Sequence, residues 1–214
     1  MLERSVQSRK RYIFALLIGT FLFLLVIFIS YFIAFIQFGK ITDMQGVTAY
    51  SLFEKKLSYS FFNEDICNQE GFRKISEDLA YQGRVLEDLE NKFGKEDKQI
   101  LERKKFYTVL LLEHMELLDK YNQGCNGSIN KILFFYSNQE NLIDSSENAG
   151  RILDLVYLKN NNLVIYAFDA NLDSEIILKL KEHYKVTQPL TLIINDEFLI
   201  SWPFNIEDIE IYLN

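Results

Sequence analysis

The chain has 214 residues, of which about half are hydrophobic and a quarter are charged, so it is not a disordered polypeptide. Its formal net charge is −7 and it has no dense basic patch, which argues against a nucleic acid partner. Two cysteines and two histidines are too few for a disulfide-rich scaffold, a cysteine-ligated zinc site or a histidine-based metal site. We therefore expect no metal ion and no cofactor.

One long apolar segment determines the expected architecture. Residues 12–38 contain no charged side chain and are dominated by Leu, Ile and Phe. A bilayer core about 30 Å thick needs about 20 helical residues, so this segment can cross it with some tilt. The alternative is a cleaved signal peptide, whose apolar region has only about 7–15 residues and ends at small residues. Here the bulky sequence FIQF ends the segment, which favours an uncleaved transmembrane helix.

The charges that flank this segment predict its orientation. Residues 1–11 carry four basic side chains and one acidic one, whereas 29 acidic and 19 basic residues follow Gly39. The positive-inside rule then places residues 1–11 in the cytoplasm, 12–38 in the cell membrane and the rest outside. We expect a helical extracytoplasmic region at 39–130 and a C-terminal domain at 131–214.

The region before residue 130 predicts a helical hairpin. Apolar residues recur at spacings of three and four over 72–93 and over 95–121, and Gly94 lies between these stretches. A shorter helix over 47–61 is expected to continue outward from the membrane. The hairpin either packs on itself and on the C-terminal domain, or forms a coiled-coil homodimer. The two stripes are Phe72, Ile75, Leu79, Gln82, Leu86, Leu89 and Phe93, and Ile100, Lys104, Tyr107, Leu111, His114, Leu118 and Tyr121.

The two cysteines flank this hairpin. Cys67 precedes its first helix and Cys125 follows its second, and an antiparallel hairpin brings these ends together. Because the space outside the cytoplasm is more oxidising, we expect a disulfide, with two buried free thiols as the alternative. The triplet at Asn126 also fits an N-glycosylation acceptor. His114 lies on an apolar stripe, so we expect a hydrogen-bonded core residue and not a ligand.

The pattern changes at residue 131 to the order β-α-β-α-β-β-α. A parallel β-α-β unit followed by an antiparallel hairpin predicts an α/β fold with a mixed four-stranded sheet and helices on both faces. Asp144 and Glu147 fit a capping box at the start of the first helix. Pro203 is expected to start the last helix. The predicted strands are 131–137, 163–168, 190–194 and 198–202, and the predicted helices are 144–158, 173–184 and 205–213.

This order, with Pro189 at the start of the third strand, resembles the thioredoxin fold. The segment VTQPLT at 186–191 is similar to the proline loop of that family, FFYS at 134–137 to its first core strand, and YAFD at 166–169 to its second. The layout also resembles archaeal membrane-anchored thioredoxin-like proteins, in which an FYSN strand end, a CxxC motif, a helical glycine and a YxFD strand recur. The glycine would be Gly150 here.

The resemblance implies a binding groove beside a cis Gln188–Pro189 peptide bond. In this mode an extended peptide pairs with the backbone next to the proline, and no cysteine is needed. The implied lining residues are Gln188, Pro189, Tyr136 and Asn138. The chain departs from the family where the two thiols should stand, because residues 143–146 read IDSS. A serine cannot replace a thiolate in disulfide exchange, and we expect these serines to cap the helix.

The sequence therefore predicts a redox-inactive, membrane-anchored thioredoxin-like protein outside the cytoplasm that binds a protein or peptide, or acts as a scaffold. The alternative is an enzyme of thiol–disulfide exchange that uses Cys67 and Cys125 as the exchanging pair. A purely structural homodimer formed through the helical hairpin is a third possibility.

Overall fold

The chain divides into two compact units, and the long N-terminal helix α1 (Leu2–Phe62) contributes residues to both. Within the described part of the chain, one helix is long and apolar enough to cross a membrane, and its candidate span is Arg11–Asp43. The length and composition of α1 thus agree with the predicted span. The computed structural model describes residues 2–62, 67, 69–125 and 129–213, and the units are 1–44 and 45–214.

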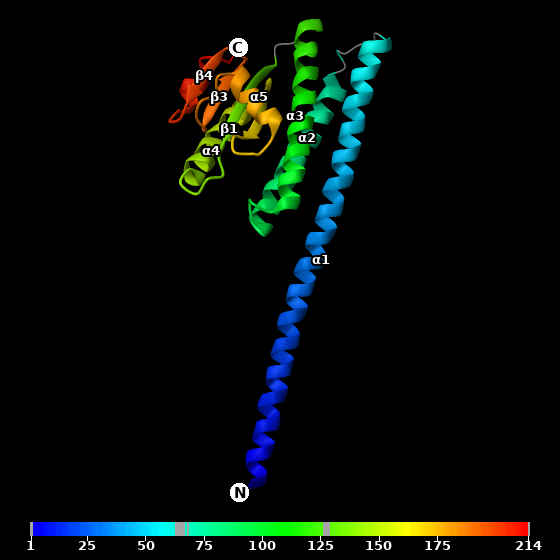
Figure 1. Ribbon diagram of the computed structural model, residues 1–214. Coiled ribbons are helices and arrows are strands. Elements are labelled where there is room, and N and C mark those ends of the chain that lie inside the picture. The colour runs from blue at the N-terminus through cyan, green and yellow to red at the C-terminus, as the bar shows by residue number, and fades with distance from the viewer. Residues whose placement is uncertain (1, 63–66, 68, 126–128, 214) are drawn as a thin grey trace. The chain divides into compact units, whose positions relative to one another are not determined.

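Two further helices, α2 (Gln69–Phe93) and α3 (Lys98–Gly124), form the predicted hairpin (Figure 1). Gly94 ends α2 with a φ of 97°, a conformation that glycine adopts without strain. Asp97 caps α3, because its carboxylate accepts the backbone N–H groups of Gln99 and Ile100. Every residue of the two predicted stripes is buried except Phe93 and Tyr107, which are half-buried, so the sequence pattern identified the packed faces correctly.

The C-terminal part contains the expected mixed sheet, in the strand order β2-β1-β3-β4. β1 pairs in parallel with β2 and antiparallel with β3, and β3 pairs antiparallel with β4. The turn between β3 and β4 places Asn195 and Asp196 in the left-handed region, which Asn and Asp tolerate better than most residues. The strands are β1 (Asn130–Tyr136), β2 (Leu163–Asp169), β3 (Thr191–Ile194) and β4 (Phe198–Ser201).

Helices cover both faces of this sheet. Residues of α4 (Ile143–Lys159) and α6 (Ile206–Glu210) share one apolar cluster with Ile132 and Phe134 of β1. The other face, with Leu133 and Phe135, packs on α5 (Glu175–His183) and on α2 and α3. Figure 1 shows α3 next to the sheet, with α2 beside it. The hairpin thus packs on itself and on the sheet, which is the first of the two predicted arrangements.

Several predicted helix boundaries differ from the structure, and three of these differences have a clear local cause. α3 begins at Lys98 and not at residue 95, because Asp97 provides the cap. α4 begins at Ile143, with Asp144 in its first turn, and its N-terminus has no side-chain cap. The capping box of this domain joins Asn205 and Asp208 at α6, so that helix does not start at Pro203.

Candidate functional site

A buried polar cluster lies at the carboxyl ends of the two parallel strands. Tyr136 ends β1 and Asp169 ends β2, and these two residues are register partners. The Oδ2 atom of Asp169 accepts hydrogen bonds from Lys104 Nζ at 2.6 Å and from Asn138 Nδ2 at 3.0 Å. Its Oδ1 atom accepts the N–H of Asn171 at 3.0 Å. Each carboxylate oxygen therefore has a partner, as a buried charge requires.

The helical hairpin supplies the cation of this cluster. Lys104 projects from α3, and its Nζ atom lies 2.6 Å from Oε1 of Glu90 on α2 as well as 2.6 Å from Asp169. The side chains of Lys104, Glu90 and Asp169 are only 7%, 10% and 6% exposed. Burial lowers the pKa of Lys104, but the nearby carboxylates of Asp169 and Glu90 outweigh that effect and raise the pKa above its usual value. Lys104 is therefore a permanent cation here.

Tyr136, a predicted groove residue, contacts this cation. Lys104 Nζ lies 5.3 Å from the centre of the Tyr136 ring, within the range of a cation–π contact. Burial raises the pKa of the Tyr136 hydroxyl, so the phenol stays neutral. Tyr136 also packs on the apolar cluster of Phe134, so it links that cluster to Lys104 of α3.

The loop at 185–190 lies at the same end of the sheet. Leu190 N donates to Phe135 O at 2.7 Å, and Trp202 N donates to Leu190 O at 2.9 Å. These bonds bring Gln188 and Pro189 to the end of β1 where Tyr136 and Asn138 are found. The structure therefore gathers all four predicted groove residues, Gln188, Pro189, Tyr136 and Asn138, at one end of the sheet.

Part of this loop presents free backbone groups. Thr187 and Gln188 are exposed, and within the described part of the chain their N–H groups have no hydrogen-bond acceptor. Gln188 precedes a proline, which restricts its backbone to extended conformations. Its carbonyl oxygen accepts a hydrogen bond from Thr191 Oγ1 at 2.9 Å. The segment can thus offer backbone donors to an extended ligand.

The expected cis bond before Pro189 is wrong. Among the described residues, the cis peptide bond joins Trp202 to Pro203, directly after β4. The chain instead turns into β3 at Leu190, whose φ is 59°. Since Trp202 pairs with Leu190, both prolines still lie next to the same end of the sheet.

Ser146, the second of the two serines at the start of α4, has a structural partner. Ser146 Oγ donates to the carbonyl oxygen of Ser137 at 2.7 Å and accepts the N–H of that residue at 3.2 Å. Ser137 Oγ in turn donates to Asn171 Oδ1 at 2.6 Å. Ser146 thus fixes the end of β1 and does not cap the helix as predicted. Its hydroxyl bonds to backbone groups and not to a base, which an activated nucleophile would require. His183 is exposed at the end of α5, where its ring meets that of Tyr184.

His114 is the hydrogen-bonded core residue that the sequence predicted. Its Nε2 atom lies 2.9 Å from Ser76 Oγ, and its Nδ1 atom lies 2.8 Å from the Tyr166 hydroxyl. The ring stacks on Phe72 with their centres 4.7 Å apart. Burial lowers the pKa of His114 to about 4, so the imidazole is neutral at physiological pH.

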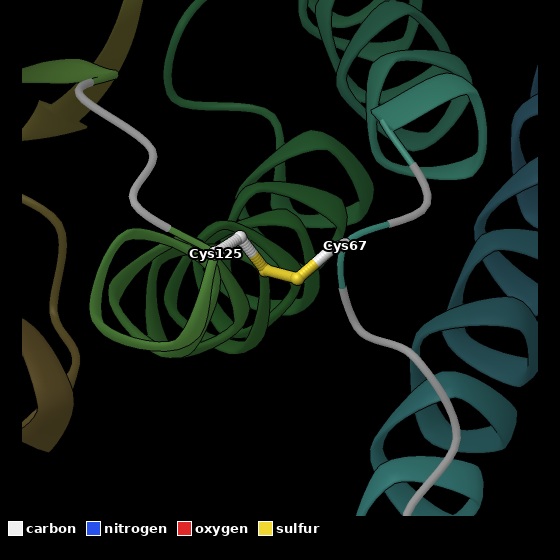
Figure 2. The surroundings of a disulfide bond; sticks show 2 residues. All are labelled: Cys67 and Cys125. Atoms are coloured by element: carbon white, nitrogen blue, oxygen red, sulfur yellow. A yellow bond between two sulfur atoms is a disulfide. The ribbon is translucent and has the colours of Figure 1, made fainter.

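The predicted disulfide is confirmed. Figure 2 shows Cys67, in the segment before α2, joined to Cys125, which directly follows α3. Their Cα atoms are 5.4 Å apart, an ordinary separation for a disulfide. The bond encloses both helices of the hairpin within one covalent loop. The glycosylation triplet at Asn126 lies outside the described residues.

No group of His, Cys, Asp or Glu residues suited to a metal ion occurs within the residues that the structure describes.

No protein-family model matches the sequence, and comparisons with curated proteins and with solved structures give no match either.

The sequence interpretation missed the buried ion cluster. Lys104 occupies a stripe position that is otherwise apolar or aromatic, between Ile100 and Tyr107, and this is the signal that could have identified it. A lysine on a buried face must find an anion, because an unpaired charge is costly to bury. The partners, Glu90 and Asp169, come from other elements and carry no comparable signal.

Proposed function

We propose that this chain is a single-pass membrane protein whose extracytoplasmic thioredoxin-like domain lacks the redox dithiol and binds extended peptide segments. The site is the end of the sheet formed by the 185–190 loop and the segment after β1. A bound peptide pairs with the backbone of Thr187 and Gln188 in the manner of an added strand.

The observation that supports this proposal is the pair of exposed, unbonded N–H groups at Thr187 and Gln188. They directly precede Pro189, at the carboxyl end of β1. The element order β-α-β-α-β-β-α agrees with a thioredoxin-like topology. The absence of cysteine from 131–214 favours binding over thiol chemistry at this end of the sheet.

The single tryptophan of the chain provides the assay. Trp202 is bonded to Leu190, so ligand binding beside Pro189 should change its emission. The full chain in detergent micelles is titrated with a tryptophan-free, carboxymethylated unfolded peptide. We expect a saturable change for the wild type and for Gln188→Ala, which keeps its backbone N–H. Gln188→Pro removes that donor and should bind at least about fivefold more weakly, since one hydrogen bond contributes about 1 kcal/mol. A wild-type chain without saturable binding would contradict the proposal.

The second candidate function is thiol–disulfide exchange through Cys67 and Cys125. The exposure of Cys67 favours this candidate, because exchange requires that a thiolate can reach the disulfide. An insulin-reduction assay on the full chain, with a dithiol as the electron donor, separates the two functions. Peptide binding alone predicts no turnover, whereas turnover that Cys67→Ser abolishes would favour exchange. Sedimentation of the same preparation tests the homodimer.

A further inference from the structure

A continuous set of hydrogen bonds and ion pairs links the helical hairpin to the segment after β1. Glu90 of α2 pairs with Lys104 of α3, Lys104 donates to Asp169 Oδ2, and Asn138 Nδ2 donates to that same oxygen. Asn138 belongs to the segment that joins β1 to α4. Removing Lys104 would therefore leave the carboxylate that holds Asn138 without its counter-ion.

The cluster is a strong constraint because it is buried. All three charged side chains are at least nine-tenths buried, so loss of Lys104 would leave the Asp169 carboxylate without its cation in a poorly solvated site. The same lysine contacts the ring of Tyr136. One side chain of α3 thus meets two of the four residues at the proposed binding end, Tyr136 directly and Asn138 through Asp169.

The chain contains a second buried lysine that pairs with two carboxylates without reaching the binding end, although these carboxylates are 39% and 44% exposed. Lys131, at the start of β1, is 6% exposed and pairs with Asp119 of α3 and with Asp196 of the β3–β4 turn. Lys104 and Lys131 therefore join α3 to opposite ends of β1. The same substitution at Lys131 removes a buried lysine from the far end of the strand and serves as the positional control.

We propose that Glu90, Lys104 and Asp169 are positioning residues, through which the helical hairpin holds Asn138 and Tyr136 in place for peptide binding. The inference rests on the proposed binding function, because the residues that it positions lie at that site. It gives the hairpin a specific role in the activity of the sheet end, beyond covering its apolar face.

The test compares Lys104→Met with Lys131→Met in the full chain. Because Lys104→Met leaves two buried carboxylates without a cation, a second variant combines Lys104→Met with Glu90→Gln and leaves a single carboxylate. Hydrogen exchange of the backbone amides of residues 137–142 reports the position of the segment independently of any ligand. Titration with the tryptophan-free unfolded peptide, followed by Trp202 emission, reports binding.

We expect both Lys104 variants to exchange faster in residues 137–142 and to bind at least tenfold more weakly, while Lys131→Met changes neither quantity. Unchanged exchange in residues 137–142 would overturn the proposal. Faster exchange throughout the sheet in the Lys104 and Lys131 variants alike would also overturn it, since that indicates a purely structural role. A wild-type chain that binds no peptide would refute the proposed function, and the exchange result would still decide whether Lys104 positions this segment.

Discussion

The Nδ1 atom of His114 on α3 lies 2.8 Å from the hydroxyl oxygen of Tyr166 on β2. This contact joins the middle of the hairpin to the sheet, and it keeps an imidazole in the core. Since Ser76 occupies the other ring nitrogen, a proton added to His114 would create a buried cation without a carboxylate among these partners.

The buried imidazole makes stability depend on pH. Burial lowers the pKa of His114 to about 4, whereas a histidine in the unfolded chain titrates near 6.5. The unfolded chain therefore binds the proton first, so stability is complete above about pH 6.5 and falls as the pH decreases towards 4. Urea unfolding measures the free energy of unfolding at each pH. Between pH 7 and pH 4 this free energy should fall by about 3 kcal/mol more for the wild type than for His114→Gln. His183→Gln is the control and should behave as the wild type, because His183 is exposed. An equal pH dependence in wild type and His114→Gln would contradict this prediction.

The disulfide should contribute substantially to stability. Cys67 and Cys125 are 58 residues apart, and closing a loop of that length restricts the unfolded chain by about 4 kcal/mol in the chain-entropy model. In denaturant unfolding, the double variant Cys67→Ala with Cys125→Ala should have a free energy of unfolding lower than that of the wild type by this amount. The free energy of unfolding of the reduced wild type should be similarly low. A loss below about 1 kcal/mol would mean that the unfolded chain is already compact between these residues.

One substitution should have opposite effects at two glycines. Gly94 has a φ of 97°, so Gly94→Ala forces alanine into a strained conformation and should destabilise the chain by about 1 kcal/mol. Gly150 lies inside α4, and an added Cβ there meets open space. Gly150→Ala should therefore stabilise by about 0.5–1 kcal/mol, because alanine has the higher helix propensity. Thermal unfolding should show a lower melting temperature for Gly94→Ala and a higher one for Gly150→Ala. Melting temperatures that shift in the same direction would refute the argument.

The orientation of α1 in the membrane should depend on its N-terminal charges. Changing Arg9, Lys10 and Arg11 to Glu removes the positive bias that is expected to keep residues 1–11 in the cytoplasm. In sealed inverted vesicles, a protease should leave residues 45–214 of the wild type intact and digest those of the variant. Replacing Arg9 and Arg11 by Lys retains the charge and should retain the protection. Protection of the triple-Glu variant would contradict the predicted orientation.

Periodicity was the strongest signal in this sequence. The hairpin was predictable because its buried positions recur every three or four residues, and the strands because they are short apolar runs between polar turns. The disulfide followed from the hairpin geometry together with the positions of Cys67 and Cys125. Each of these predictions rests on a pattern within one element or between elements that follow each other in the chain.

The errors arose where a distant residue decides the local structure. Asp144 and Glu147 fit a capping box, but Ser146 bonds to the end of β1 and the helix begins one residue earlier. The isomer of an X–Pro bond depends on tertiary contacts, so the sequence could not distinguish Pro189 from Pro203. Lys104 and Asp169 are 65 residues apart, and no local pattern relates them.

The covalent loop closed by Cys67 and Cys125 also affects how the chain responds to proteolysis. A cut in the turn around Gly94, between α2 and α3, leaves two fragments that the disulfide still joins. The sheet would remain linked to α1 after such a cut, and release would require reduction as well. A nicked chain should therefore migrate as one species without reductant and as two species with it.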